Sequence, residues 1–300
     1  MVPIVLQNPY RSGNDLWLKG NLHAHTTRSD GTSEPEAVIA AYEGQGYDFL
    51  AITDHDLLVS PDAYQGQTSI VLIPGVEVSA RGPHILHIGA KAVIEPDADR
   101  QRVIDAINAS GGLAILNHPN FERHFNHFPQ ELMESLEGAV GVEVYNGLVE
   151  RYSGAALASD RWDRLLSKEK WLWGFGTDDL HRPEDIAVAW IVVQAETRTA
   201  DAILDGIRRG RFYASTGVTI NEVIVNERTV TIHTEDAQRI RFITGWGGVI
   251  RSTVKDRTAS WTVPDVPDLL ERLKYVRIEC YGEGGLAAWT QPIRMVLSEG

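Results

Sequence analysis

The chain has 300 residues, a formal net charge of −13 at pH 7 and a single cysteine, Cys280. The length predicts one large domain, or a large domain with a smaller one, and a lone cysteine excludes an intrachain disulfide, which is typical of a reducing compartment. The acidic balance argues against sequence-indifferent binding to nucleic acid. It allows a small anionic substrate, because bound cations can reverse the local field.

The first residues lack the basic and apolar regions of a secretory signal, and no apolar run approaches the roughly 20 residues of a membrane helix. We therefore expect a cytoplasmic protein that does not enter a membrane and forms no stable complex with nucleic acid. The sequence does not specify the oligomeric state.

Apolar strands alternate with helices from the start of the chain to about residue 210. Residues 16–25, 47–55, 69–80, 84–90, 113–119, 140–146 and 171–181 are predicted as strands, and residues 33–46, 97–110 and 198–210 as helices. This alternation predicts an α/β domain built on parallel strands, either an open doubly wound sheet or a barrel.

The texture of the chain changes after the segment "GRFYASTG". From there to the end, the segments are short, rich in β-branched residues and alternating in hydrophobicity, which predicts a small antiparallel β-sandwich. We expect an α/β domain over residues 1–215 and a β-sandwich domain over residues 216–300.

Residues that can bind metal ions recur on the predicted strands, mostly where a strand ends. Carboxyl ends of parallel strands gather at one face of an α/β fold, so these side chains are expected to converge. Imidazole and carboxylate groups together suit manganese, iron and zinc, and the sequence does not choose among the three. The candidates are His23, His25, Asp30, His55, Glu77, His84 or its rival His87, His118, Asp179 and His181.

Each of these signals is weak when taken alone. A single His-x-His is more often polar loop chemistry than a metal site, and Asp30 in "SDG" is an ordinary turn residue. The ordered combination after several strands favours a joint metal site. His124 and His127 lie in a loop and are expected at the surface unless they touch the substrate.

Five segments resemble the motifs of the PHP family, named for its polymerase and histidinol-phosphatase members. They are "LHAHTTRSDG", "AITDH", "PGVEVSA", "NHP" and "GTDDLH", in this order. The resemblance implies a distorted seven-stranded (β/α) TIM-like barrel that holds two or three divalent metal ions. The strings "GRFYASTG" and "AWTQPI" resemble a longer branch of the family with a C-terminal β domain, which includes carbamate hydrolases.

The resemblance also implies a ligand set. His23, His25, Glu77 and Asp179 would hold a first metal, and Glu77 would bridge to a second metal bound by His118 and a histidine of the fourth strand. Asp30, which stands where the family often has histidine, would hold a third metal with His55 and His181. For the fourth strand, the family spacing before Gly89 favours His84 over His87, which lies on the opposite strand face.

These residues imply a metal-dependent phosphoesterase that hydrolyses a small phosphorylated metabolite or nucleotide by attack of a metal-bridging hydroxide. We expect Glu77, Asp54 and His118 to serve catalysis, with Asp54 and Glu143 orienting imidazole N–H groups. Arg28 and Arg182 would bind the phosphate or remain in solvent. The alternative is a carbamate or ester hydrolase on the same site, and a third hypothesis is a metal-stabilised scaffold whose β domain binds a sugar or a protein.

Overall fold

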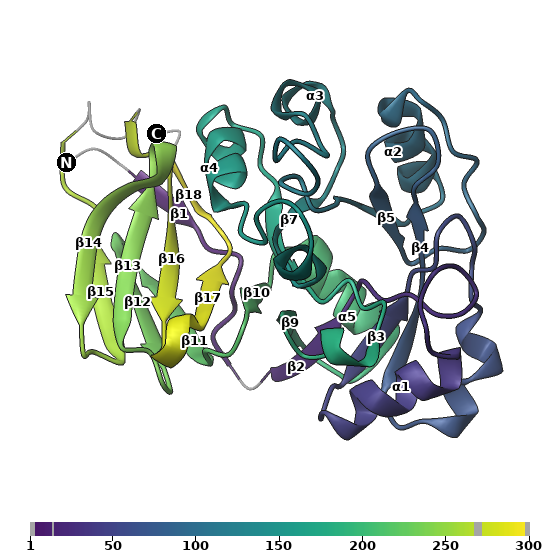
Figure 1. The fold of residues 1–300 in the computed structure, drawn as a ribbon. Helices are drawn as coiled ribbons and strands as arrows, with labels where there is room; N and C mark the ends of the chain where they lie inside the picture. The colour runs from purple at the N-terminus through teal and green to yellow at the C-terminus, as the bar shows by residue number, and fades with distance from the viewer. Residues whose placement is uncertain (1–3, 14, 267–271, 298–300) are drawn as a thin grey trace.

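The computed structural model describes residues 4–13, 15–266 and 272–297. Its mixed α/β part is built on a row of strands in the order β10-β9-β2-β3-β4-β5-β6-β7-β8, with helices packed around them (Figure 1). The strands are β2 (Leu16–Asn21), β3 (Phe49–Ile52), β4 (Val71–Val78), β5 (Ile85–Ile88), β6 (Leu113–Leu116), β7 (Gly141–Asn146), β8 (Trp173–Thr177), β9 (Trp190–Ala195) and β10 (Phe212–Ser215). The helices are α1 (Pro35–Gly44), α2 (Arg100–Ala109), α3 (Gln130–Ser135), α4 (Ser159–Ser167) and α5 (Ala200–Arg208).

The row of strands curls into a barrel-like unit. Strand β8 contacts β9 and β10, and beyond the ends of β2 and β8 the backbone meets again in a parallel bridge between Ala24 and Leu180. This contact brings the segments that follow the first and the last parallel strand to one edge. The expected α/β architecture is therefore present, in a barrel-like form rather than as an open sheet.

Helices cover the strands with an apolar stripe, as α2 illustrates. Its Val103, Ile104 and Ile107 are at most 1% exposed and pack in one cluster with Val76 of β4 and residues of β6. The three positions recur at the 3.6-residue period of a helix, and the Asp99 side chain caps the helix by accepting a hydrogen bond from the Gln101 amide. Most of the polar residues of the helix face solvent, whereas Arg100 at its start is buried.

Strand β5 is a correction to the all-parallel prediction, because it runs antiparallel to both β4 and β6. Only residues 79–84 separate β4 from β5, and a parallel crossover needs a dozen or more residues, so this connection can only form a hairpin. The start of β5 therefore lies beside the carboxyl end of β4. His84, directly before β5, reaches the edge where the other candidate ligands gather.

The C-terminal part contains two sheets that share an apolar core. Strands β11 (Ile220–Asn226), β12 (Thr229–Thr234) and β15 (Thr258–Thr262) form one of them. The other continues the large sheet through β13 (Arg239–Thr244), β14 (Gly248–Val254), β16 (Tyr275–Tyr281), β17 (Ala287–Thr290) and β18 (Ile293–Leu297). Val230, Ile232, Phe242 and Ile278 from both sheets belong to one buried cluster.

The two parts of the chain are joined by strand pairing. Strand β1 (Ile4–Gln7) pairs with β18, and β17 pairs with β10 of the barrel-like unit. Residues 4–7 thus lie with the C-terminal strands, although the sequence assigns them to the first domain. The division at residue 215 and the sandwich remain predictions.

Within the part of the chain that the structure describes, no helix combines the length and the apolar character that a membrane crossing requires.

Candidate metal centre

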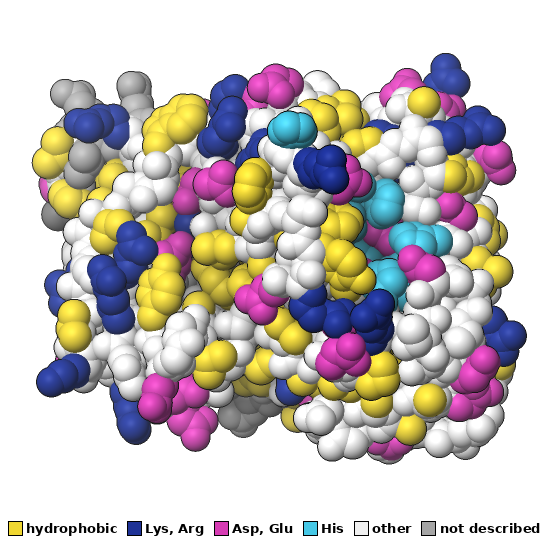
Figure 2. All heavy atoms as spheres, in the orientation of Figure 1, with side chains coloured by type: hydrophobic (Ala, Val, Ile, Leu, Met, Phe, Trp, Pro, Cys, Tyr) yellow, Lys and Arg dark blue, Asp and Glu magenta, His cyan; other side chains and the backbone are white. Residues whose placement is uncertain are grey.

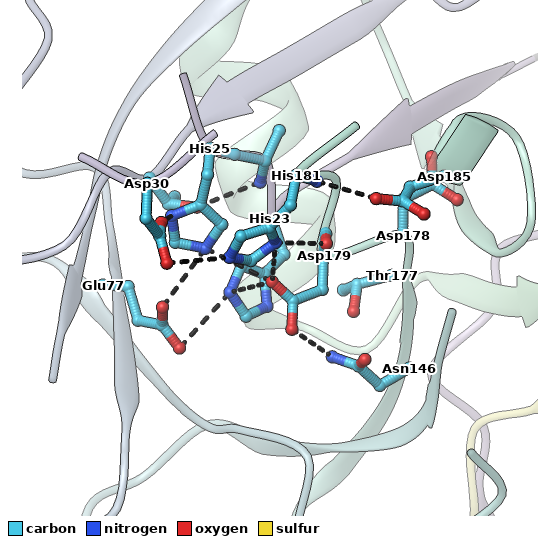
Figure 3. A network of polar contacts seen from close by, with 12 residues as sticks. His23, His25, Asp30, Glu77, Asn146, Thr177, Asp178, Asp179, His181 and Asp185 are labelled. Atoms are coloured by element: carbon cyan, nitrogen blue, oxygen red, sulfur yellow. Dashed lines mark hydrogen bonds and ion pairs between the residues drawn. The ribbon is translucent and has the colours of Figure 1, made fainter. Parts of the chain in front are cut away.

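The candidate ligands other than His87 converge in one cluster with the Glu77 carboxylate, at the edge of the barrel-like unit. Figure 3 labels His23, His25, Asp30, Glu77, Asp179 and His181 among them. Glu77 is 1% exposed and lies inside a ring of imidazoles. Its oxygens are 3.3 Å from His23 Nε2, 3.2 Å from His25 Nε2, 2.9 Å from His55 Nδ1, 3.0 Å from His84 Nδ1 and 3.3 Å from His118 Nε2.

Asp179 and Asp30 complete two flanks of the cluster. Asp179 Oδ1 lies 3.2 Å from both His23 Nε2 and His25 Nε2, in the group expected to hold the first metal. Asp30 Oδ2 lies 3.3 Å from His181 Nε2 and 3.5 Å from His55 Nε2, in the group expected to hold the third. His25, Asp30, His55 and His181 each offer a donor atom within 4.8 Å of the others, a spacing that one cation can bridge.

Several metal-binding atoms of the cluster are buried and make no hydrogen bond of acceptable geometry among the described residues, although oxygens of Glu77 and Asp179 lie close to some of them. They are His23 Nε2, His25 Nε2, His55 Nδ1, His118 Nδ1 and Asp179 Oδ1. Buried polar atoms in native proteins are nearly always satisfied, so these lone pairs imply a partner that is not a protein atom. Nitrogen and carboxylate oxygen donors at these spacings fit divalent cations.

The electrostatics of the cluster also favour cations. Burial alone would lower the pKa of His23, but the carboxylates of Asp179, Glu77 and Glu143 raise this pKa well above its usual value. The pKa of Glu77 stays well below its usual range because the imidazoles outweigh its burial. The carboxylates thus create a negative potential that stabilises positive charge among the imidazoles. Because a proton and a metal ion compete for the same imidazole nitrogen, this potential also favours a bound metal ion.

Two candidate ligands adopt a backbone conformation that is uncommon outside glycine. His118 has φ of 24° and Asp179 has φ of 53°, both in the left-handed region. Such strain costs about 1–3 kcal/mol and persists where the surrounding structure requires it, most often at functional sites. Both residues lie just past the end of a parallel strand, where the chain turns and brings their side chains to the cluster.

Glu143 on β7 supports the cluster from behind, as expected. Its carboxylate is 2.7 Å from His23 Nδ1 and accepts hydrogen bonds from Thr177 Oγ1 at 2.6 Å and the His118 amide at 2.7 Å. Asn146, which the sequence did not single out, donates from Nδ2 to Glu143 at 2.9 Å and to Asp179 Oδ2 at 3.1 Å. Glu143 thereby leaves the Nε2 lone pair of His23 facing Glu77 and Asp179.

Asp54 differs from the expectation that it orients an imidazole, because its carboxylate binds to a loop instead. It accepts hydrogen bonds from the Thr26 amide at 2.8 Å, from Thr26 Oγ1 at 2.6 Å and from Ser29 Oγ at 2.6 Å. Ser29 Oγ lies 3.4 Å from His25 Nδ1, so Asp54 reaches His25 only through this hydroxyl. Asp54 is fully buried and does not line the cavity.

Three other candidates are not among the residues that line the cavity. His87 faces the outer side of β5, where its Nε2 is 3.2 Å from Ser110 Oγ. The exposed side chain of Arg28 lies 3.6 Å from Glu34, and Arg182 is also exposed. Neither of these two arginines is among the residues that line the cavity, and their binding of a phosphate stays a prediction.

His127 was expected at the surface unless it touches the substrate, and the structure places it against two candidate ligands. Its ring centroid is 4.6 Å from that of His84 and 4.5 Å from that of His118, and its Nε2 accepts a hydrogen bond from the His84 amide at 3.1 Å. Burial and the neighbouring imidazoles of His118 and His84 lower the pKa of His127 to about 2, so its ring is neutral. The only signal in the sequence was its place in the loop after the "NHP" segment. His124 is exposed.

The donor groups open into a cavity of about 280 Å³. Figure 2 shows histidine side chains in this hollow, with hydrophobic side chains beside them and Lys or Arg side chains close to its rim. An open cavity beside a metal-binding cluster lets a small anion approach, whereas a purely structural metal site is closed.

Comparisons with known sequences give partial matches, and no protein-family model matches the chain. A 5′-3′ exoribonuclease from Haemophilus influenzae is 37% identical over 75 residues, which are 23% of this chain and 27% of that protein. The 5′-3′ exoribonuclease Rnm of Salmonella typhimurium is 39% identical over 74 residues, 23% of this chain and 25% of that protein. The chain thus matches only about a quarter of the length of these curated relatives.

Solved structures give a match over nearly the whole chain. A two-domain protein from Bacteroides vulgatus, described as containing a predicted PHP-like metal-dependent phosphoesterase, is similar over 94% of both chains, with a TM-score of 0.55 and 19% sequence identity. The resemblance to the longer, carbamate-hydrolase branch stays a prediction. The chain therefore has the fold of the PHP-like metal-dependent phosphoesterases, which confirms the resemblance expected from its motifs.

Proposed function

We propose that this protein is a metal-dependent phosphoesterase that hydrolyses a small phosphorylated metabolite or nucleotide. It would use two or three divalent ions, manganese, iron or zinc, bound in a distorted seven-stranded barrel with a C-terminal β-sandwich beside it. The first ion would be held by His23, His25, Glu77 and Asp179, the second by Glu77, His84 and His118, and the third by Asp30, His55 and His181.

The observation that carries this proposal is the environment of Glu77. Five imidazoles surround one buried carboxylate, and several of their buried nitrogens make no well-aligned hydrogen bond to it or to any other described residue. Divalent ions at such a site act as Lewis acids toward a phosphoryl oxygen and lower the pKa of water from 15.7 toward about 7.

The chain itself supplies orientation and access. Glu143 and Asn146 fix the directions of His23 and Asp179, so the lone pairs of these ligands need no reorganisation. The cavity, which Glu77 and candidate ligands from each expected metal group line, would admit a phosphate group to the cluster. His127 packs on His84 and His118 as a neutral ring and limits their rotation.

Metal content and phosphate release together test this function. The protein as purified, a chelated sample and samples reloaded with manganese, iron or zinc are assayed on phosphomonoesters, phosphodiesters and an aryl carbamate. His23→Ala and Asp179→Ala are expected to lose bound metal and at least about 100-fold in turnover, while His233→Ala in the C-terminal part matches the wild type.

The outcomes separate the candidate functions. Equal turnover in metal-free and metal-loaded samples contradicts the proposal, and cleavage of the carbamate alone favours the carbamate or ester hydrolase. The panel also includes a short single-stranded RNA, because 75 residues of the chain are similar to an exoribonuclease. The net charge of −13 argues against RNA as the substrate. RNA cleavage with no release from phosphomonoesters would replace the small-molecule substrate by a nucleic acid.

A further inference from the structure

Part of the cavity wall carries no metal-binding group. Phe121, Leu148 and Tyr152 line it. The ring centroid of Phe121 is 5.3 Å from that of His118 and 6.3 Å from that of Tyr152, and each pair of rings is nearly perpendicular, at 77° and 80°. An apolar wall therefore starts beside a candidate ligand and extends toward the mouth of the cavity, in keeping with the hydrophobic side chains beside the histidines in Figure 2.

This aromatic wall, formed by Phe121 and Tyr152 with Leu148 below them, is held by two loops that pair with each other. The Glu122 amide donates to the Ser153 carbonyl at 2.9 Å, and the Ala155 amide donates to the Asn120 carbonyl at 3.1 Å. Gly154 is required between them, because it has φ of 131° and a Cβ there would lie 2.3 Å from the Asn120 oxygen.

Helix α4 fixes the same loops from outside the cavity. Arg161 donates from Nε to Asn120 Oδ1 at 2.9 Å and from Nη2 to the Phe125 carbonyl at 2.6 Å. The position of Phe121 is thus set by a paired backbone and a charged side chain. A wall that is fixed before a ligand arrives loses little conformational freedom on binding.

Tyr152 keeps 51% of its surface exposed at this position, although it stands against a cavity. A ring that packs on Tyr152 and Phe121 would remove apolar surface of both partners from water. The volume of about 280 Å³ suits a phosphate with one ring system and is too small for a duplex.

We propose that Phe121 and Tyr152 are specificity-determining residues that bind a planar aromatic group of the substrate, such as a nucleobase, while its phosphate faces the ligand cluster. This inference rests on the proposed phosphoesterase function and narrows its substrate class. Aromatic side chains bind nucleobases by stacking and do not distinguish the hydrogen-bonding groups at their edges. The site is therefore expected to accept several planar ring systems.

Two matched phosphomonoesters test the wall in the metal-loaded full-length protein. Adenosine 5′-phosphate and ribose 5-phosphate share the phosphate and the leaving oxygen, and they differ in the base. The wild type is expected to favour the adenosine compound about tenfold in kcat/KM, mainly through KM, and Phe121→Leu and Tyr152→Leu are expected to bring the ratio near one. Tyr152→Phe keeps the ring and the ratio, and Phe125→Leu, an exposed residue on the same loop that does not line the cavity, also keeps it.

Dissociation constants from calorimetry on the same two compounds separate this inference from the proposed function. A wild-type ratio near one, in turnover or in binding, overturns the aromatic wall. Tighter binding of the adenosine compound that depends on Phe121 and Tyr152, without phosphate release from any ester, supports the wall and overturns the phosphoesterase.

Discussion

Glu143 is a buried side chain whose hydrogen bonds leave its carboxylate fully engaged. It faces His23 Nδ1, Thr177 Oγ1, the Asn146 amide and the His118 backbone amide, all within 2.9 Å. These donors come from the ends of different strands, so one acid ties His23, His118 and, through Asn146, Asp179 into a single orientation. A residue with no place in the cavity can therefore determine how well the ligands act together.

Glu143→Gln tests this role at nearly constant volume. A glutamine amide keeps only one of the two oxygens, so two of the four donors would face its N–H₂ group. Either His23 and Thr177 or His118 and Asn146 would lose their acceptor, and the orientation of the cluster would loosen. We expect metal affinity to fall about 10- to 100-fold, measured by competition with a chelator, with an unchanged circular dichroism spectrum. Glu131→Gln, an exposed substitution on α3, is the matched control, and equal affinities of the two variants would contradict the role of Glu143.

At the scale of elements, the direction of β5 decides which of two nearby histidines reaches the site. The register pairs Glu77 with Leu86 and Val76 with His87, so His87 shares the outer face with Val76. There it lies under the end of α2, beside Ser110, and close enough to Gly112 that a Cβ at that glycine would lie 2.5 Å from His87 Nε2. The outer face of β5 thus holds a fully buried imidazole with no metal-binding neighbours among its described contacts.

This burial makes a prediction about pH. Burial lowers the pKa of His87 from 6.5 to about 4, so between these values the unfolded chain binds a proton that the folded protein does not. The stability that His87 contributes is complete above pH 6.5 and is lost as the pH falls toward 4. On lowering the pH from 7.5 to 5, the wild type should lose about 2 kcal/mol of unfolding free energy more than His87→Leu.

Urea titrations of both proteins at several pH values, with the same bound metal, measure this difference. The acid sensitivity of the metal centre is common to the two proteins and cancels in the comparison. Parallel dependences of the unfolding free energy on pH would show that His87 is already protonated in the folded state, or that it is accessible to water.

At the scale of the whole molecule, continuous strand pairing joins the barrel-like unit to the C-terminal strands. Strand β17 lies between β10 and β16, so the large sheet runs from the site edge into the other part. A buried charge cluster reinforces the junction, because Arg277 on β16 is 1% exposed and reaches Asp163 on α4 with Nε at 2.8 Å and Nη2 at 2.6 Å. The two parts are therefore expected to unfold together.

The sequence predicted what short-range patterns encode. Strand ends and helix stripes follow from local periodicity, so His23, His25, His118 and Asp179 could be assigned to strand ends on one face. The direction of β5 was also within reach, since residues 79–84 are too few for a crossover. The short loop between β4 and β5 allows only an antiparallel pair, although the alternation of strands and helices predicted a parallel strand there.

The remaining features depend on contacts between distant segments. Strand β1 pairs with β18 across almost the whole chain, and the loop of Phe121 pairs with the loop of Tyr152 through Gly154. Nothing in the sequence distinguishes Asp54 from a carboxylate that orients an imidazole. Its hydrogen bonds to Thr26 and Ser29 follow only from the fold around it. Periodicity carries no information on such pairings, which explains why the aromatic wall and the junction were not predicted.

The Arg277–Asp163 pair offers the most direct test of the junction. Arg277 also donates to Glu279 at 2.9 Å, and its guanidinium lies 5.0 Å from the Trp162 ring centroid. Removal of the guanidinium leaves the buried carboxylates of Asp163 and Glu279 without this partner. Arg277→Met is therefore expected to cost about 3–5 kcal/mol of unfolding free energy in urea titrations.

Asp163→Leu combined with Arg277→Met should cost less than the sum of the two single substitutions, because no unpaired charge then remains at Asp163. Arg239→Met, an exposed substitution on β13, is the matched control and should stay within about 0.5 kcal/mol of the wild type. Loss of stability in Arg277→Met is expected as one cooperative transition that also releases the bound metal, because the sheet couples the two parts. Two separate transitions, with metal retained through the first, would show that the C-terminal strands unfold independently of the metal centre.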